Sequence, residues 1–184
     1  MHRLLILPLV ALALCLGSCR QKVKEYDYPA WGFRISFASP PQVEDKPATA
    51  DGTPHSFTAD LDGGVRDFAI EANDAPGTRD IDQIVDATIP LILKDIPKGE
   101  VTSHTYAATV EGLMGRQLDI SVGGKAIYRV HVFLTGGRLY TIVAKSALGV
   151  DDPAVDQFLY SFHTLPGTPA ANAAANTAAN AATP

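Results

Sequence analysis

Three side chains in the middle of the sequence, His104, Asp119 and Tyr128, are of types that bind polar ligands or take part in proton transfer. An imidazole gives or takes a proton near neutral pH, a carboxylate can orient that imidazole, and a phenol can hydrogen-bond to either group. Such a set catalyses a reaction only when a nucleophile or a bound metal ion completes it. The missing component would have to come from the rest of the sequence.

The rest of the sequence contains no standard catalytic motif. Neither a GxSxG elbow, an HExxH pair, a phosphate-binding loop nor a GxGxxG turn occurs. The histidines that follow residue 19 are widely spaced, and no two of them lie at the spacing of metal ligands on one helix: His55, His104, His131 and His163. We therefore predict no catalytic residue, no cofactor and no metal site, and interpret His104, Asp119 and Tyr128 as a structural cluster, with the floor of a binding pocket as the alternative.

These three residues are neighbours only if two turns are both of the two-residue type. Glu111-Gly112 and Gly123-Gly124 separate three runs of strand-like sequence. Two-residue turns at both places put His104 opposite Asp119, and Asp119 opposite Tyr128. Directly opposed residues have Cβ atoms about 4.5–5.5 Å apart, so the side chains would meet on one face of a sheet. A slip of one residue at either turn would separate them.

The elements that would hold this cluster follow from hydrophobic periodicity. Alternation of apolar and polar residues predicts one strand, then a hairpin, then a four-stranded antiparallel meander, over residues 32–37, 56–61, 66–71, 101–110, 113–122, 125–134 and 138–145. A helical stripe with Asp80 as N-cap predicts a helix over Asp80–Ile96, and Asp152-Pro153 predicts the start of a second helix that buries Phe158 and Phe162. The prediction from these patterns is an α+β fold with an antiparallel sheet.

The start of the chain carries a different kind of chemistry, because it resembles a bacterial lipoprotein signal. An apolar run from Leu4 to Leu16 ends in Leu16-Gly17-Ser18-Cys19. As a helix the run covers roughly 20 Å, which is shorter than the ~30 Å hydrocarbon core of a bilayer. The resemblance implies cleavage before Cys19, acylation of Cys19 and anchoring in a membrane, with the protein facing the periplasm. Arg20 after the cysteine resembles the pattern of lipoproteins sent to the outer membrane of Gram-negative cells.

The chain divides into four parts on this interpretation. Residues 1–18 are the signal peptide, residues 19–30 a polar tether, residues 31–165 a single folded domain and residues 166–184 a disordered tail of Ala, Asn, Pro and Thr. Cleavage removes Arg3, so the formal charge changes from -5 to -6, and a mildly acidic surface argues against non-specific binding of nucleic acid. The only cysteines are Cys15 and Cys19, so disulfides and thiol chemistry are excluded from the folded part.

The domain resembles the PsbP-like family at its two ends. The stretch Trp31-Gly32-Phe33-Arg34-Ile35-Ser36-Phe37 resembles the family's first strand, and Arg138-Leu139-Tyr140 with Phe158-Leu159-Tyr160-Ser161-Phe162 resembles its closing strand and helix. The resemblance covers residues 31–165 and implies an α/β/α sandwich around the antiparallel sheet. The best-known members, an extrinsic photosystem subunit and a Ran-binding import factor, are binding proteins. No functional residue of either can be carried over to this sequence.

Two hypotheses about function follow. The first is a non-catalytic envelope lipoprotein that binds a protein partner or assists assembly, and it is favoured by the anchor, the small domain and the lack of catalytic motifs. The second is an anchored hydrolase or small-ligand-binding protein that uses the polar face of the meander. A pocket that converges on His104, Asp119 and Tyr128 would favour the second hypothesis.

Overall fold

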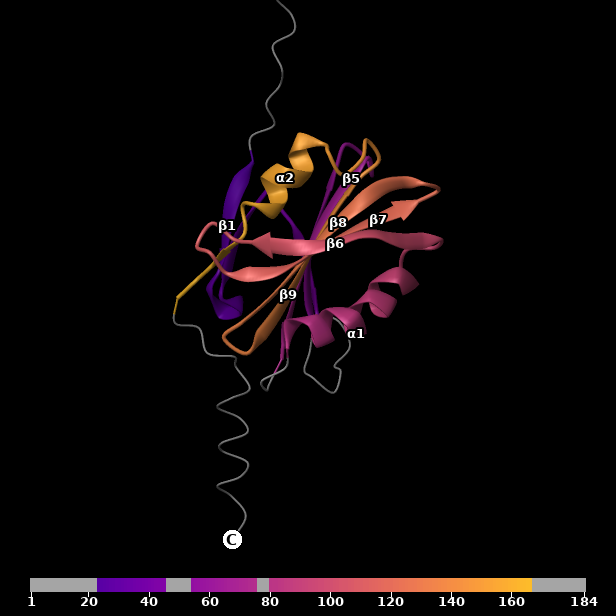
Figure 1. Cartoon of the computed structure of the whole chain (residues 1–184). Helices are drawn as coiled ribbons and strands as arrows, with labels where there is room; N and C mark the ends of the chain where they lie inside the picture. Colours follow the sequence, from indigo (N-terminus) through magenta and orange to yellow (C-terminus); the bar gives the residue numbers. More distant parts are fainter. Residues whose placement is uncertain (1–22, 46–53, 76–79, 167–184) are drawn as a thin grey trace, which may run out of the picture.

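A computed structural model describes residues 23–45, 54–75 and 80–166, and these residues form two antiparallel sheets and two α-helices (Figure 1). The larger sheet has seven strands in the order β3-β4-β5-β9-β8-β7-β6. Its strands are β3 (Gln42–Asp45), β4 (His55–Leu61), β5 (Arg66–Asp74), β6 (Gly99–Ala108), β7 (Met114–Val122), β8 (Lys125–Thr135) and β9 (Arg138–Ser146). The predicted hairpin and the predicted four-stranded meander are both present, and β9 joins them by pairing with β5.

The smaller sheet has three strands, and one of them lies where the sequence predicts a tether. β2 (Phe33–Phe37) pairs with β1 (Lys24–Tyr28) and with the short β10 (His163–Thr164), and a 3₁₀ turn at Pro29–Trp31 joins β1 to β2. The prediction of a polar tether over residues 19–30 is therefore wrong from Lys24 onward. The tyrosines of β1 alternate with charged residues and pack on the core, which is what a half-buried strand requires.

Charged residues on the outer side of β1 pair with its neighbour β2. The guanidinium of Arg34 donates to both carboxylate oxygens of Asp27 and also lies 3.3 Å from Glu25. On the inner side, the ring of Tyr28 lies 4.9 Å from that of Phe33 and 4.4 Å from that of Phe57. β1 is therefore part of the folded domain, and the domain begins no later than Lys24.

Each face of the large sheet has its own core, because alternate residues of every strand point to opposite sides. In β9, Tyr140, Ile142 and Ala144 belong to a core shared with the small sheet and α2 (Pro153–Leu159). Leu139 and Val143 of the same strand pack on the other face, in a core covered by α1 (Ile81–Lys94). The layer on the α2 side is thus a sheet together with a helix, whereas the sequence predicts a helix alone.

The two helices begin where their capping residues predict. Asp80 is the N-cap of α1, and its side chain accepts from the backbone N–H of Asp82 at 3.1 Å. Asp152 is the N-cap of α2 and accepts from the N–H of Ala154, also at 3.1 Å. The predicted core positions of the closing helix are confirmed, since Phe158 and Phe162 are 3% and 1% exposed.

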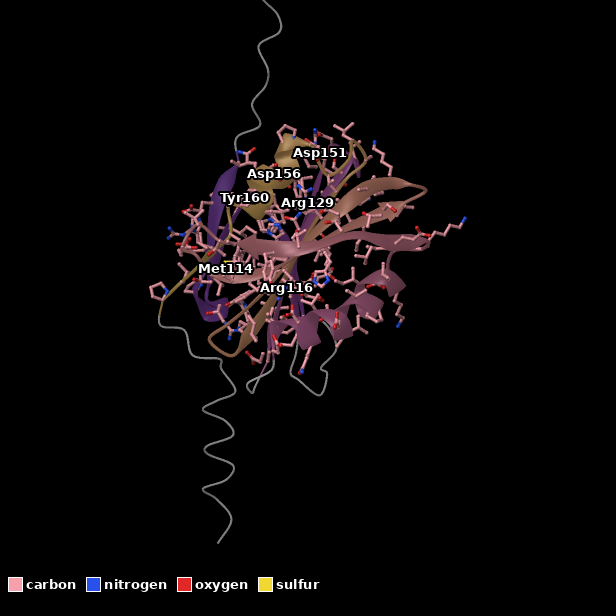
Figure 2. The ribbon with its side chains drawn as sticks, viewed as in Figure 1. Met114, Arg116, Arg129, Asp151, Asp156 and Tyr160 are labelled. Carbon is pink, nitrogen blue, oxygen red and sulfur yellow. The ribbon has the colours of Figure 1, made fainter. Side chains whose placement is uncertain are left out.

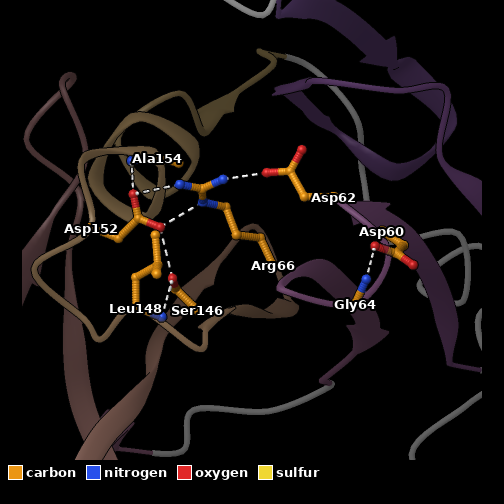
Figure 3. Close-up of polar contacts among 8 residues, drawn as sticks. All are labelled: Asp60, Asp62, Gly64, Arg66, Ser146, Leu148, Asp152 and Ala154. Carbon is orange, nitrogen blue, oxygen red and sulfur yellow. Dashed lines mark hydrogen bonds and ion pairs between the residues drawn. The ribbon is translucent and has the colours of Figure 1, made fainter.

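The N-cap of α2 is also the centre of a buried polar network (Figure 3). Arg66 of β5 donates through Nε to Asp152 at 2.6 Å, and the hydroxyl of Ser146 donates to the same carboxylate oxygen at 2.7 Å. A second carboxylate, Asp62 in the β4–β5 turn, pairs with the other side of the Arg66 guanidinium. The network ties the start of α2 to β5 and β9.

The predicted antiparallel α+β fold with two helices is confirmed by these elements. Within the described residues no helix is long and apolar enough to cross a membrane.

Candidate functional site

The predicted pairing of His104 with Asp119 is wrong. Thr109 and Leu113 close the β6–β7 connection, with the N–H of Thr109 donating to the carbonyl oxygen of Leu113 at 3.0 Å. Three residues therefore form the loop, where the sequence predicts two. Gly112 has a φ of +83°, as expected for the left-handed residue that ends a three-residue hairpin loop. The extra loop residue shifts the register, so His104 lies opposite Leu118.

The predicted pairing of Asp119 with Tyr128 is also wrong, although the turn between β7 and β8 has the expected two residues. Val122 lies opposite Lys125, as predicted from the turn at Gly123-Gly124. A bulge then shifts the register between Ile120 and Ser121, so Ile120 lies opposite Tyr128. A bulge adds one residue to one strand and moves every later pair by one position.

As a result, the three candidate residues do not form a site. Leu118 packs in the core on the α1 side, so its partner His104 points to that side of the sheet. Asp119 is the next residue along β7 and points to the α2 side. Tyr128 packs against the core on the α1 side, opposite Ile120. The register therefore separates His104 and Asp119 onto opposite faces.

Asp119 instead takes part in a three-residue ion-pair group on the α2 side. It lies opposite Arg129, which donates to its two carboxylate oxygens at 2.8 and 3.0 Å. The same guanidinium donates to Asp156 of α2 at 3.2 Å. The hydrogen bond from the guanidinium to Asp119 raises the pKa of Arg129, and burial opposes that rise. Arg129 is therefore held as a cation between two carboxylates and has no free donor face for an anionic ligand.

Next to this group lies a buried histidine that the sequence analysis does not assign to the candidate site. His131 is 1% exposed, and its Nε2 lies 3.0 Å from the side-chain oxygen of Gln117, its opposite residue on β7. The ring of Tyr160, just after α2, packs edge-on at 5.9 Å. Burial lowers the pKa of His131 to about 4, and the positive charge of Arg129 adds to that effect. The ring is therefore neutral at physiological pH.

On the α1 side of β6 there is a shallow hollow of about 380 Å³. The guanidinium of Arg116 lies 4.0 Å above the ring of Tyr106, its opposite residue on β6, and pairs with Asp82 of α1. His104 also lines the hollow. Tyr106 is 69% exposed, so its aromatic ring is presented to the outside, whereas the Arg116 side chain against it is only 11% exposed.

Large apolar side chains are exposed along β6 and around its ends. They come from β6 itself, from the loop after it, from the start of β7 and from the C-cap of α2: Tyr106, Val110, Met114 and Tyr160. In Figure 1 β6 crosses the front of the molecule, with α2 above it and α1 below it. Figure 2 shows Tyr160 and Asp156 above the strand and Arg116 below it. We call this region the β6 surface. It consists of β6 and the flanking residues Val110, Met114, Arg116, Asp156 and Tyr160.

A second hollow, of about 550 Å³, lies on the α1 side of the sheet near β3, β4 and β5. Tyr128, Lys145, Asp67 and Asp60 line it in one row across four strands. Lys145 donates to Asp67, and Asp60 accepts from the N–H of Gly64. The hydrogen bond from Lys145 to Asp67 raises the pKa of the lysine. The lysine that lines this hollow is therefore already paired with a carboxylate.

No cluster of three or more metal-ligating side chains occurs among the residues that the structure describes. Cys19, the predicted site of acylation, lies outside them, as do the signal peptide and nearly all of the predicted tail.

Comparison with solved structures finds the same fold in a cyanobacterial protein. The solution structure of cyanobacterial PsbP from Synechocystis sp. PCC 6803 superposes with a TM-score of 0.56 and 15% sequence identity. The match covers 83% of this chain and 98% of that chain. The chain has a PsbP-like fold. No protein-family model and no curated protein matches the sequence, so the PsbP-like likeness is one of fold alone.

Proposed function

We propose that this protein is a membrane-anchored lipoprotein of the cell envelope that binds a protein partner through the β6 surface and catalyses no reaction. The observation that carries the proposal is the exposure of large apolar and aromatic side chains beside one edge of the large sheet. Aromatic residues and methionine are enriched at protein interfaces, and both occur here in Tyr106, Tyr160 and Met114.

The arrangement of polar groups supports a binding role more than a catalytic one. His104 and Asp119 lie on opposite faces of the sheet, and the arginines near them are already paired with carboxylates. The alternative, a small-ligand-binding protein, would use the hollow beside Tyr128 and Lys145. It is the weaker proposal because the lysine of that hollow is already paired with Asp67.

The membrane anchor is tested by Cys19→Ser. We expect the variant to leave the membrane fraction, because several acyl chains contribute about 0.8 kcal/mol per buried CH₂ and no other part of the proposal holds the chain at a bilayer. The measurement is immunoblotting of membrane and soluble fractions, with Cys15→Ser as the matched control. Retention of both variants in the membrane fraction would contradict acylation at Cys19.

The binding surface is tested by a photo-crosslinking amino acid placed at Val110 in living cells. Val110 is 72% exposed beside the β6 surface, and Leu91 on α1 is 67% exposed and serves as the matched control. We expect one discrete protein adduct from position 110 and none from position 91. If adducts form equally at both positions, or at neither, the β6 surface is not the binding surface.

A further inference from the structure

The two edges of the large sheet differ in how well they are protected from pairing with another chain. β3 has only four residues, follows Pro40-Pro41 and ends in Glu44-Asp45. Short length, proline and charge are the usual means by which proteins block edge strands. β6 has ten residues, and none from Val101 to Val110 is charged at neutral pH or is a proline.

The outer side of β6 is therefore able to pair. Among the described residues β6 pairs with β7 alone, so every second residue directs its backbone N–H and C=O away from the sheet. A bulge at Thr102 is held by a hydrogen bond from its hydroxyl to the carbonyl oxygen of Asp119, at 3.2 Å. Beyond the bulge, Ser103–Ala108 pairs with β7 without interruption, and these six residues form a regular edge.

An added strand would place its side chains alternately on the two sides of the sheet. On the α1 side they would meet His104, Tyr106 and the hollow beside Arg116. On the α2 side they would extend the row that runs from Thr105 through Gln117 and His131 to Tyr160. Main-chain hydrogen bonds with alternate side-chain sites are the features of recognition by strand addition.

The charges that flank β6 indicate the chemistry of the added strand. Carboxylates outnumber guanidinium groups by three to two, giving a net charge of -1: Asp82, Asp119 and Asp156 against Arg116 and Arg129. Both arginines are already paired with carboxylates from this set. An incoming strand with lysine or arginine side chains would therefore be attracted, and an acidic one repelled.

Two other occupants of this edge are excluded, one by the same charges and one by its amino-acid composition. A second copy related by two-fold symmetry would bring two acidic sets of flanking groups together. Residues 167–184 of the chain itself contain no charged side chain and consist mostly of Ala, Asn and Pro, which are depleted in strands.

We infer that Ser103–Ala108 of β6 accepts an extended, basic segment of a partner protein as an additional antiparallel or parallel strand. The inference rests on the proposed function, because a strand-addition site is useful only to a protein that binds other chains. It goes further in naming the backbone edge as the contact and basic residues as the partner's chemistry.

Hydrogen exchange on the full chain, purified in mild detergent, tests this inference. The probe is a capped peptide of alternating valine and lysine at millimolar concentration. Because added backbone hydrogen bonds protect amides, we expect exchange within Ser103–Ala108 to slow by about tenfold or more, with β3 unchanged. Two control peptides keep the length: one carries glutamate in place of lysine, and one has alternate amides N-methylated. Protection by the N-methylated peptide, or none by the valine–lysine peptide, overturns strand addition, and equal protection by the glutamate peptide overturns the basic partner.

A pair of variants tests the same site by mutation. Thr105→Lys puts a charge on the exposed edge, and Val43→Lys puts the same charge on the exposed β3 edge. We expect Thr105→Lys to weaken peptide binding by about tenfold or more, since a lysine on an edge strand blocks pairing and repels a basic segment, and Val43→Lys to leave it unchanged. Equal effects of the two variants overturn the inference. If crosslinks form at position 110 in cells but the peptide does not protect Ser103–Ala108 from exchange, the proposed function stands and strand addition is overturned. If the peptide protects Ser103–Ala108 but no crosslink forms, the proposed function is overturned.

Discussion

Replacing Asp152 with alanine should lower the free energy of unfolding by about 3 kcal/mol, within the usual range for breaking a buried ion pair. The Asp152 side chain is 4% exposed and accepts from Arg66, from Ser146 and from the N–H of Ala154. Removing it leaves a guanidinium and a buried hydroxyl without their acceptor and removes the N-cap of α2. Urea unfolding at pH 7 measures the loss.

Asp62→Ala is the matched control for this variant, because Asp62 is the second carboxylate on the same guanidinium. Its side chain is 44% exposed, and exposed ion pairs contribute about 0–1 kcal/mol. We expect a loss at least two or three times smaller than that of Asp152→Ala. Equal losses in the two variants would show that the network does not depend on the buried carboxylate.

The same network gives the protein a dependence on acid. Burial by itself raises the pKa of Asp152, but hydrogen bonds from Arg66, Ser146 and the Ala154 amide outweigh burial and leave the pKa below its usual value of 3.8. A carboxyl group whose pKa is lowered by folding stabilises the folded state above its unfolded pKa, and this contribution is lost as the pH falls through the folded value. The contribution of Asp152 is therefore complete at neutral pH and disappears only below about pH 4.

Local signals in the sequence predicted the parts of the fold that local chemistry determines. Asp80 and Asp152-Pro153 identify the starts of both helices because an N-cap needs only the two or three residues after it. Gly123-Gly124 likewise identifies a two-residue turn.

Two of the strands, β3 and β1, are not predicted by the sequence analysis. β3 contains three polar residues out of four and is a strand only because β4 pairs with it, from Gln42 opposite Thr58 onward. β1 does alternate, with Tyr26 and Tyr28 between charged residues, but its closeness to Cys19 made a tether the simpler interpretation. The contacts that make β1 a strand, its pairing with β2 and the ion pair of Asp27 with Arg34, lie outside the segment itself.

The predicted cluster of His104, Asp119 and Tyr128 is wrong for a related reason, because strand register depends on features that have no local signal. Each residue added to a hairpin loop moves every pair of the two strands by one position. One extra residue in the loop that ends at Gly112 therefore moves His104 away from Asp119. The bulge between β7 and β8 gives no signal in the sequence, yet it replaces Tyr128 by Arg129 as the partner of Asp119. On the α2 side, His131 and Gln117 become neighbours only once the bulge is known, and Thr105 joins them only once the loop shift is known.

Lowering the pH from 6.5 to 4 should destabilise the folded protein through His131 by roughly 3 kcal/mol. Folding lowers the pKa of this ring from its usual value of 6.5 to about 4, because the ring is buried and Arg129 lies near it, while Asp119 opposes this change only in part. Below pH 6.5 the unfolded chain takes up a proton that the folded chain refuses, so stability falls by about 1.4 kcal/mol per pH unit until the folded ring also titrates near pH 4.

The decisive measurement is the free energy of unfolding in urea at several pH values between 4.5 and 6.5, where carboxyl groups with lowered pKa values such as that of Asp152 still stay ionised in the folded state. His131→Gln removes the titrating ring and keeps a polar group beside Gln117, so its stability should be nearly constant across this interval. His104→Gln is the matched control, since His104 is exposed on β6 and is hydrated in both states. It should keep the wild-type slope. A His131→Gln variant that loses stability as steeply as the wild type would show that the buried ring does not resist protonation.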